Sequence, residues 1–191
     1  FVTSGAGAIG SMAGQIARLL GATRVIGTTS NQEKARWMQA QLGYDAVITR
    51  EGEPIREQLA RVAPEGIDVI VDMVGGEQLA AALEIARHGA RCVLLGAVSA
   101  ELNPHSATLK APVELDTFQL ILKGVTIRGF SADEEAPEMF DAWIRQLALW
   151  QRGSGIRIAH TLVKGLDQAP LALQEACAGH LKSLVLVELE Q

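Results

Sequence analysis

Cysteine is scarce in this sequence, and its scarcity bears on which sites the chain can form. Cys92 and Cys177 are the only two among 191 residues, and neither lies in a Cys-x-x-Cys motif or a Cys/His cluster. Structural zinc sites need such clustered ligands. We therefore predict no metal site in this chain. Cys92 stands in an apolar segment and is predicted to be a buried small hydrophobic residue.

Basic clusters and long apolar runs are also lacking. The chain has 17 Lys and Arg residues against 22 Asp and Glu residues, and its net charge is −5 at pH 7. Nucleic-acid binding relies on clustered cations that neutralise phosphates, and a membrane-spanning helix needs about 20 apolar residues. We therefore expect a small-molecule partner rather than nucleic acid or a membrane. The few cysteines favour a cytoplasmic protein.

A glycine motif near the start is the most informative feature that is present. Gly5, Gly7 and Gly10 have the spacing Gly-x-Gly-x-x-Gly, between a short β-type run and a helical pattern. In such a motif the first glycine permits a tight turn, the second lets the backbone approach a pyrophosphate, and the third allows close helix packing. The helix start also favours an anion. The motif predicts a dinucleotide site that includes Gly7, Ala8, Ile9 and Gly10.

Strand-like and helix-like patterns alternate along most of the chain. After a first short strand ahead of Gly5, strands are predicted at 24–29, 46–49, 67–72, 90–95 and 125–129, and helices at 8–20, 30–42, 55–62, 77–86, 116–122 and 134–151. Such alternation is typical of a parallel sheet covered on both faces. We expect an α/β Rossmann fold, with a doubly wound parallel six-stranded sheet in the order 3-2-1-4-5-6.

The second predicted helix begins with a capping pattern. Ser30 is followed three residues later by Glu33, which matches a capping box. In a capping box the two side chains bond each other's backbone N–H groups. We therefore expect Ser30 to cap this helix, Glu33 to turn back toward its start, and Gly43 to end it.

Two other segments stand apart from the alternation. Residues 97–115 contain two prolines and little periodicity, and we expect a long functional loop there. A strand–helix–strand tail follows, with strands at 158–163 and 184–188 that need not extend the main sheet. We divide the chain into a dinucleotide-binding domain at 1–152 and a tail at 153–191. The chain starts at Phe1, only four residues before Gly5, so we expect further sequence upstream.

The tip of the second predicted strand bears on the choice of cofactor. An acidic residue there would bond the adenosine 2′-hydroxyl and select NAD. Here the tip carries hydroxyls, at Thr28, Thr29 and Ser30, and no carboxylate. Lys34 and Arg50 follow at positions from which cations can approach a 2′-phosphate. We predict NADP(H), bound by Thr29, Ser30, Lys34 and Arg50; the alternatives are a solvated Lys34 and a surface Arg50.

Two glycine-containing turns follow central strands. Gly75-Gly76 comes after one strand, and residues 95–99 come after the next. Ligands collect at the carboxyl ends of strands in open α/β sheets, and small residues there let a nicotinamide ring approach the backbone. The alternative is that these glycines only make tight turns.

Ordered motifs along the whole chain carry a family resemblance. Residues 7–17, 66–76, 95–99, 127–130 and 165–170 resemble the zinc-independent, quinone oxidoreductase-like medium-chain dehydrogenase/reductase superfamily. Within it, the chain resembles the branch of prostaglandin reductases, leukotriene B4 dehydrogenases, alkenal reductases and bacterial curcumin reductases. The resemblance implies a two-domain enzyme with an upstream GroES-like catalytic domain, which the tail would complete. It further implies metal-free, NADPH-dependent reduction of the activated C=C bond of an enone, alkenal or quinone, in a homodimer.

The same resemblance implies roles for individual residues. It places residues 7–10 at the pyrophosphate and Lys34 at the 2′-phosphate. It implies that Val98 and Ser99 border the nicotinamide, with Phe130 and Ser131 nearby. Val74 and Gly96 are further expected cofactor-binding residues.

The chain departs from the family pattern at four places. Arg50 stands where the family has Tyr, Met73 where it has Asn, and Glu101 where the branch often has Tyr. Residues 179–183 lack the Asn and the Gly-Lys pair of the family.

The catalytic residues are not identified by the sequence. His88, His105, His160 and His180 are scattered, and we interpret each as a surface or loop residue. The expected chemistry is hydride transfer to the β-carbon of the alkene, after which hydrogen bonds stabilise an enolate that solvent protonates. The alternatives are a zinc-dependent alcohol dehydrogenase with its ligands upstream, and a non-catalytic NADPH-binding sensor. We expect residues 1–191 alone to be inactive.

Overall fold

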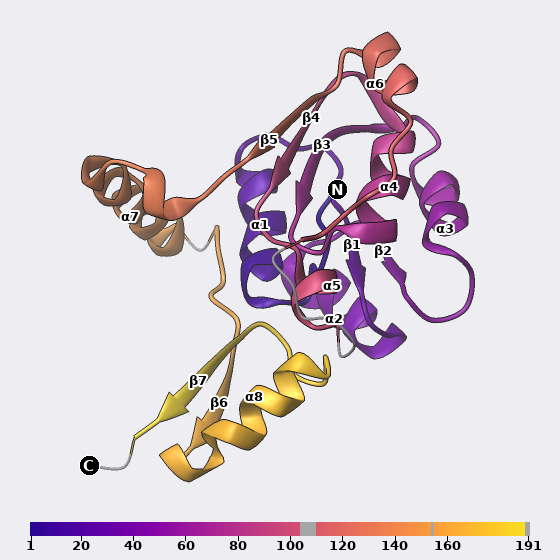
Figure 1. The fold of residues 1–191 in the computed structure, drawn as a ribbon. Helices are drawn as coiled ribbons and strands as arrows, with labels where there is room; N and C mark the ends of the chain where they lie inside the picture. Colours follow the sequence, from indigo (N-terminus) through magenta and orange to yellow (C-terminus); the bar gives the residue numbers. More distant parts are fainter. Residues whose placement is uncertain (104–109, 154, 190–191) are drawn as a thin grey trace.

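The computed structural model describes residues 1–103, 110–153 and 155–189, and its centre is a parallel sheet (Figure 1). Strand β1 (Ile26–Thr29) pairs with β2 (Ala46–Thr49). Strands β3 (Ile67–Asp72), β4 (Ala86–Leu94) and β5 (Thr126–Gly129) pair in that order. All of these pairs are parallel, as the sequence predicts for this fold class.

The N-terminal residues join the two groups of strands. Val2 forms parallel bridges with Gly27 of β1 and with Val71 of β3. Its backbone N–H donates to Ile26 O at 2.9 Å, and Val71 N–H donates to Phe1 O at 2.9 Å. The strand order is therefore β2, β1, the Val2 segment, β3, β4 and β5, which is the doubly wound order of a Rossmann sheet.

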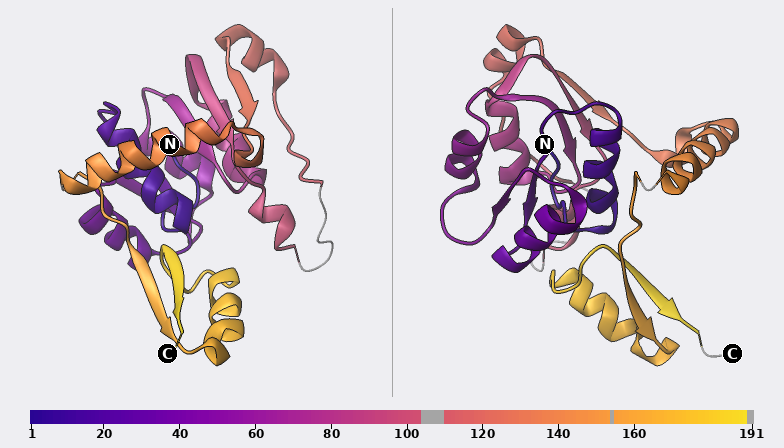
Figure 2. Two further views of the ribbon diagram at one scale, coloured as in Figure 1. Left: turned by 90° about the vertical axis from the view of Figure 1, so that its left-hand side faces the viewer. Right: turned by 180° about the vertical axis from the view of Figure 1, so that it is seen from behind.

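Helices cover both faces of this sheet. Helices α1 (Ala8–Leu19) and α2 (Gln32–Leu42) pack against each other on one face, and α3 (Ile55–Val62) and α4 (Gly76–Glu84) do so on the other (Figures 1 and 2). Helix α6 (Thr117–Lys123) lies beside β4. Among the described residues, no helix has the length and apolar character to cross a membrane.

Each face of the sheet has its own hydrophobic core. One core contains Ile48, Leu59, Ile70 and Cys92, and the other contains Met38 and its neighbours around α1 and α2. Cys92 is 1% exposed, so the prediction of a buried cysteine is confirmed. Burial, and then the charge of Asp72, raise the pKa of the Cys92 thiol to about 12. The thiol therefore stays protonated and serves as an apolar core residue.

A tyrosine holds α1 close to the sheet. The ring of Tyr44 lies against Gly14 and Gly27, where an added Cβ would come within 2.4 Å and 2.6 Å of ring atoms. The Tyr44 hydroxyl donates to Gly10 O at 2.7 Å. Burial raises the pKa of this phenol, which keeps it a donor. No sequence motif predicts this role of Tyr44; the only indication in the sequence is the pair of glycines, Gly14 and Gly27, that leave room for its ring.

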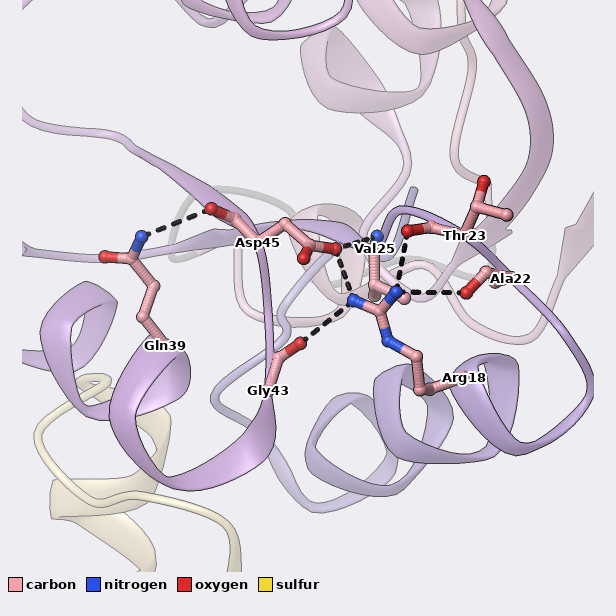
Figure 3. Close-up of polar contacts among 7 residues, drawn as sticks. All are labelled: Arg18, Ala22, Thr23, Val25, Gln39, Gly43 and Asp45. Carbon is pink, nitrogen blue, oxygen red and sulfur yellow. Dashed lines mark hydrogen bonds and ion pairs between the residues drawn. The ribbon is translucent and has the colours of Figure 1, made fainter.

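A polar network ties the end of α1 to the strands that follow (Figure 3). The Arg18 guanidinium donates to Ala22 O and Thr23 O, and it pairs with the Asp45 carboxylate. Asp45 also accepts from Val25 N at 2.6 Å. These bonds join the loop before β1 to the loop before β2, so the two loops hold the amino ends of both strands in place.

The start of α2 corrects one prediction. Asn31, not Ser30, caps the helix, and its side-chain oxygen accepts from Lys34 N at 2.9 Å. The predicted capping box is therefore wrong: both residues suit an N-cap, and only the chain path from β1 selects Asn31. Glu33 does not turn back to the helix start; it pairs with Lys182 at 2.6 Å. Gly43 ends the helix with φ +70°, as predicted.

Two other boundaries differ from the predictions. Helix α4 ends at Glu84, and Ala86 begins β4, so the predicted helix at 77–86 is too long. Within the predicted loop at 97–115 the chain forms a short helix, α5 (Val98–Glu101). Part of that loop, residues 104–109 with His105, lies outside the described residues.

The last third of the chain extends away from the main sheet. After a 3₁₀ turn (Ala132–Glu134), helix α7 (Pro137–Arg152) projects outward (Figures 1 and 2). Strands β6 (His160–Lys164) and β7 (Leu184–Glu188) then form a separate parallel pair, joined by a 3₁₀ turn (Leu166–Gln168) and α8 (Ala169–Cys177). The expected strand–helix–strand tail is confirmed, and its strands stay outside the main sheet.

Candidate nucleotide-binding site

A pocket of about 800 Å³ opens at the carboxyl ends of the central strands. The glycine loop, the ends of β1, β2 and β3, helix α5 and the turn after α8 all contribute to its wall. This edge is where ligands bind in open α/β sheets. Eight of the predicted cofactor residues line the pocket: Gly7, Thr29, Ser30, Lys34, Arg50, Val74, Val98 and Ser99.

The glycine loop leads directly into α1. Gly7 is the N-cap of the helix, and its own N–H donates to Ser4 O at 2.8 Å. A Cβ on Gly10 would lie 2.2 Å from Ser4 O, so only glycine permits this close packing. Because Gly7 brings no side chain to the helix end, the N–H groups of the first turn remain available to an anion.

Lys34 lies at the end of the pocket nearest β1 and β2. It is 5% exposed, and its ammonium donates to the backbone carbonyls of Gly179 and Leu181, the latter at 2.6 Å. Burial, followed by the charges of Lys182 and Arg50, lowers the pKa of Lys34. An ammonium has three N–H groups, so one remains for a ligand. The gathering of positive charge makes an anion favourable here.

The turn after α8 closes this end of the pocket. Ser183 N donates to Ala6 O at 2.7 Å, and Ser183 also bridges Gly7. Lys182 pairs with Glu33 of α2. The tail was expected to serve a different domain, yet Gly179 and Leu181 line the pocket. In the sequence, residues 179–183 stand out only because they depart from the family pattern, and that departure does not predict their place in the pocket wall.

A buried carboxylate organises the turn after β3. Asp72 is 0% exposed and accepts from Thr3 Oγ1 and from Gly75 N, both at 2.9 Å. Burial raises the pKa of Asp72, and these hydrogen bonds oppose that rise. Gly75 has φ +74°, in the left-handed region that favours glycine. The carboxylate therefore fixes a turn that presents Val74 and Gly75 to the pocket.

Ser99 is tied to the same turn. Its hydroxyl donates to Val74 O at 2.6 Å, and its backbone N–H donates to that oxygen at 3.1 Å. The hydroxyl is thus already engaged within the chain. Ser99 positions the wall of the pocket by holding α5 against the turn after β3.

Six predicted cofactor residues are not among those that line the pocket: Ala8, Ile9, Gly10, Gly96, Phe130 and Ser131. Ile9 is 54% exposed on the first turn of α1. A Cβ on Gly96 would lie 3.1 Å from Met73 O, which explains a glycine at this close approach. The Phe130 ring faces Trp143 of α7, with 6.2 Å between ring centroids.

The acidic and metal-binding side chains of the described residues are dispersed. In the part of the chain that the structure describes, no three His, Cys, Asp or Glu residues are grouped to hold a metal ion. His180 contacts Glu175 at 2.8 Å, at the surface of the tail. Neither the sequence nor this arrangement of the described residues identifies a catalytic residue.

Comparison with known proteins defines the family. The profile of the family described as zinc-binding dehydrogenase matches residues 8–148. The chain therefore belongs to this family, within the quinone oxidoreductase-like medium-chain dehydrogenase/reductases, and the resemblance noted in its motifs is confirmed.

Three relatives show how the match extends. An NADP-dependent oxidoreductase of Cochliobolus heterostrophus is 32% identical over 171 residues, covering 88% of this chain and 47% of the relative. The NADPH-dependent curcumin reductase of Escherichia coli is 30% identical over 173 residues, covering 88% and 49%. The crystal structure of CurA from Vibrio vulnificus in complex with NADPH has a TM-score of 0.87 and 30% identity, covering 100% and 56%. The chain thus spans about half the length of the relatives it matches.

Proposed function

We propose that this chain is the nucleotide-binding part of an NADPH-dependent oxidoreductase that reduces the activated C=C bond of an enone, alkenal or quinone. One observation carries the cofactor assignment. The end of the pocket at β1 gathers Lys34 and Arg50 with the hydroxyls of Thr29 and Ser30, and no carboxylate stands at the strand tip. Cations and hydroxyls suit a 2′-phosphate, and the strand tip lacks the acidic residue that selects NAD.

The pocket also suits the rest of the dinucleotide. The first turn of α1 offers free N–H groups and a positive dipole end, which fit a pyrophosphate. Val74, Val98 and Ser99 also line the pocket, and they would border the nicotinamide. NADPH-binding relatives, among them the CurA structure, support the same assignment. The placements of Ala8, Ile9, Gly10, Gly96, Phe130 and Ser131 remain predictions.

The residues of this chain would bind and orient the cofactor rather than perform proton chemistry. When bound, NADPH would supply the hydride that reaches the β-carbon of the alkene. Lys34 would hold one end through the phosphate, and the turn fixed by Asp72 would set the wall at the other end. Such fixing at both ends keeps the reacting atoms aligned. Groups that stabilise the developing enolate would come from an upstream GroES-like domain.

Exposed apolar side chains support a larger assembly. On α7, Trp143 is 40% exposed and Ile144 is 64% exposed, and on β6 Leu162 is 51% exposed. Apolar faces of this kind mark contact with other protein. They support the proposed division at residues 1–152 and 153–191, with the tail completing the upstream domain of a cytoplasmic homodimer.

Titration of the full-length protein with NADPH and NADH tests the cofactor. We expect at least tenfold tighter binding of NADPH, about 1.4 kcal/mol, and loss of that preference in Lys34→Ala. Lys164→Ala is the matched control, because Lys164 is an exposed tail residue outside the pocket. Equal affinities for the two cofactors in the wild type would overturn the 2′-phosphate assignment.

Turnover and metal content test the reaction. We expect the full-length protein to oxidise NADPH with a panel of enones, alkenals and quinones, without stoichiometric zinc. Stoichiometric catalytic zinc would favour the alcohol dehydrogenase alternative. The description of the matched family, zinc-binding dehydrogenase, is the reason to measure it. NADPH binding without oxidation on any substrate would favour a sensor. Residues 1–191 alone should bind without turnover.

A further inference from the structure

A buried glutamine on α4 faces the same pocket and had no predicted role. Gln78 is 8% exposed and lines the pocket. Its Oε1 accepts from the hydroxyl of Thr28 at 2.6 Å. Thr28 belongs to β1, so this bond joins the first turns of α4 to the strand that leads into the phosphate end of the pocket.

Hydrogen bonds around Thr28 set how the amide lies in the structure. Ser4 N–H donates to Thr28 Oγ1 at 3.0 Å, and the Thr28 hydroxyl donates its own hydrogen to Gln78 Oε1. The Gln78 oxygen thus faces Thr28, and the NH₂ group, which carries the two donors of the amide, is the part left for other partners.

That NH₂ group is open to the pocket. No hydrogen bond from Gln78 Nε2 to another described residue is present, yet no buried side-chain nitrogen or oxygen among the described residues lacks a partner. Nε2 is therefore not sealed inside the protein but accessible from the pocket that Gln78 lines. A ligand bound there can accept a hydrogen bond from it.

The neighbours of Gln78 indicate which part of the ligand this is. Thr28 directly precedes Thr29 and Ser30, at the strand tip that meets the adenosine ribose. Pro54 and Ile55, after β2, line the same pocket. The start of α4 also lies near Ser99, whose Oγ would be 3.4 Å from a Cβ on Gly76, but the only side-chain hydrogen bond that Gln78 forms among the described residues is the one to Thr28.

We propose that Gln78 is a specificity-determining residue whose amide donates to an acceptor of the adenosine half of the dinucleotide. The acceptor is a ribose oxygen or a ring nitrogen, not the 2′-phosphate. This assignment rests on the proposed cofactor, and it adds a contact that recognises adenosine with or without the 2′-phosphate. Lys34 and Arg50 then discriminate NADPH from NADH, whereas Gln78 acts equally on both.

Fragments of the cofactor test the assignment on the full-length protein. The probes are adenosine 2′,5′-bisphosphate, 5′-AMP and nicotinamide mononucleotide. In Gln78→Met we expect about tenfold weaker binding of both adenosine nucleotides, as expected for one lost hydrogen bond, with unchanged binding of nicotinamide mononucleotide. Gln78→Glu should weaken both at least as much, because a carboxylate offers no donor. Gln39→Met, on the exposed side of α2, is the control for the same chemical change.

An NMR signal separates direct contact from a structural role. The side-chain NH₂ resonances of Gln78, identified by their absence in Gln78→Met, should shift when adenosine 2′,5′-bisphosphate is added. Unchanged affinities in a folded Gln78→Met protein would overturn the role of Gln78 and leave the cofactor proposal intact. Equal losses for all three probes would also overturn it, because they would mean general damage to the site. A wild type that binds neither NADPH nor NADH would overturn both proposals.

Discussion

The main sheet and the C-terminal sheet differ in burial in a way that strand composition does not explain: β1 has two threonines, whereas β7 is mostly leucine and valine. All four residues of β1 are buried, whereas exposed and half-buried residues alternate along β6 and β7. Strand β1 lies between two neighbours and beneath helices on both faces, while β6 and β7 pair only with each other beside α8 (Figure 1). Apolar composition alone therefore does not determine burial; the number of covered faces does.

The two regions meet through several polar contacts, and Ala159 of the tail also packs against the core around α1 and α2. Lys34 donates to the carbonyls of Gly179 and Leu181, and Gln15 exchanges two hydrogen bonds with the backbone of Arg157. Hydrogen bonds are directional, so they fix the position of the tail turn at modest net stability. The main sheet supplies stability, and the tail supplies one wall of the pocket.

The largest expected effect comes from matched leucines in the two regions. Leu59 of α3 is 0% exposed and Leu162 of β6 is 51% exposed. In residues 1–191 alone, we expect Leu59→Ala to lower the free energy of unfolding by about 2–5 kcal/mol, and Leu162→Ala to lower it by less than about 0.5 kcal/mol. Urea unfolding measures both. A comparable loss in Leu162→Ala would mean that the tail has a core of its own.

A pair of glycines gives a smaller effect. A Cβ on Gly14 would lie 2.4 Å from Tyr44 Cζ, whereas one on Gly153, after α7, would find its nearest contact at 3.6 Å. We expect Gly14→Ala to cost about 1–3 kcal/mol of stability through overpacking, partly offset by helix propensity. Gly153→Ala should be close to neutral. Thermal unfolding of both variants checks the pair. An unchanged unfolding midpoint in Gly14→Ala would contradict the close packing of the Tyr44 ring against Gly14.

The smallest effect concerns the ion pair between the two regions. A hydrogen bond from Lys182, and then its charge, lower the pKa of Glu33 from its ordinary 4.5. A lowered carboxyl pKa means that the pair stabilises the fold above pH 4.5, and that this contribution disappears as the pH falls through the folded-state pKa. Urea unfolding of wild type and Glu33→Gln should differ slightly at pH 7, and the difference should shrink as the pH falls below 4.5. A difference that stays the same from pH 7 into strong acid would exclude this pair as its source.

The fold was predictable because its signals are local. The glycine spacing, the apolar runs of the parallel strands and Gly43 at the end of α2 each act within a few residues. The cap of α2 was mispredicted because Ser30 and Asn31 both suit that position. Only the backbone path out of β1 decides between them.

The site was predictable only in part, for a different reason. The pocket residues next to strand ends follow from topology, as with Thr29 and Val74. Gln78 and Gly179 follow from contacts between distant segments, which no periodicity encodes. The placement of Phe130 came from a family pattern; in this structure its ring lies near Trp143, and its place at the cofactor stays a prediction.

The carbonyl partners of Lys34 have a consequence for biosynthesis. Gly179 and Leu181 are 145 and 147 residues downstream of the lysine. A ribosome that has made the whole main sheet has therefore not yet made the groups that hold this ammonium. The nascent sheet emerges with this lysine unheld, and the end of the pocket that we propose for the phosphate is complete only when residues 179–181 have left the exit tunnel.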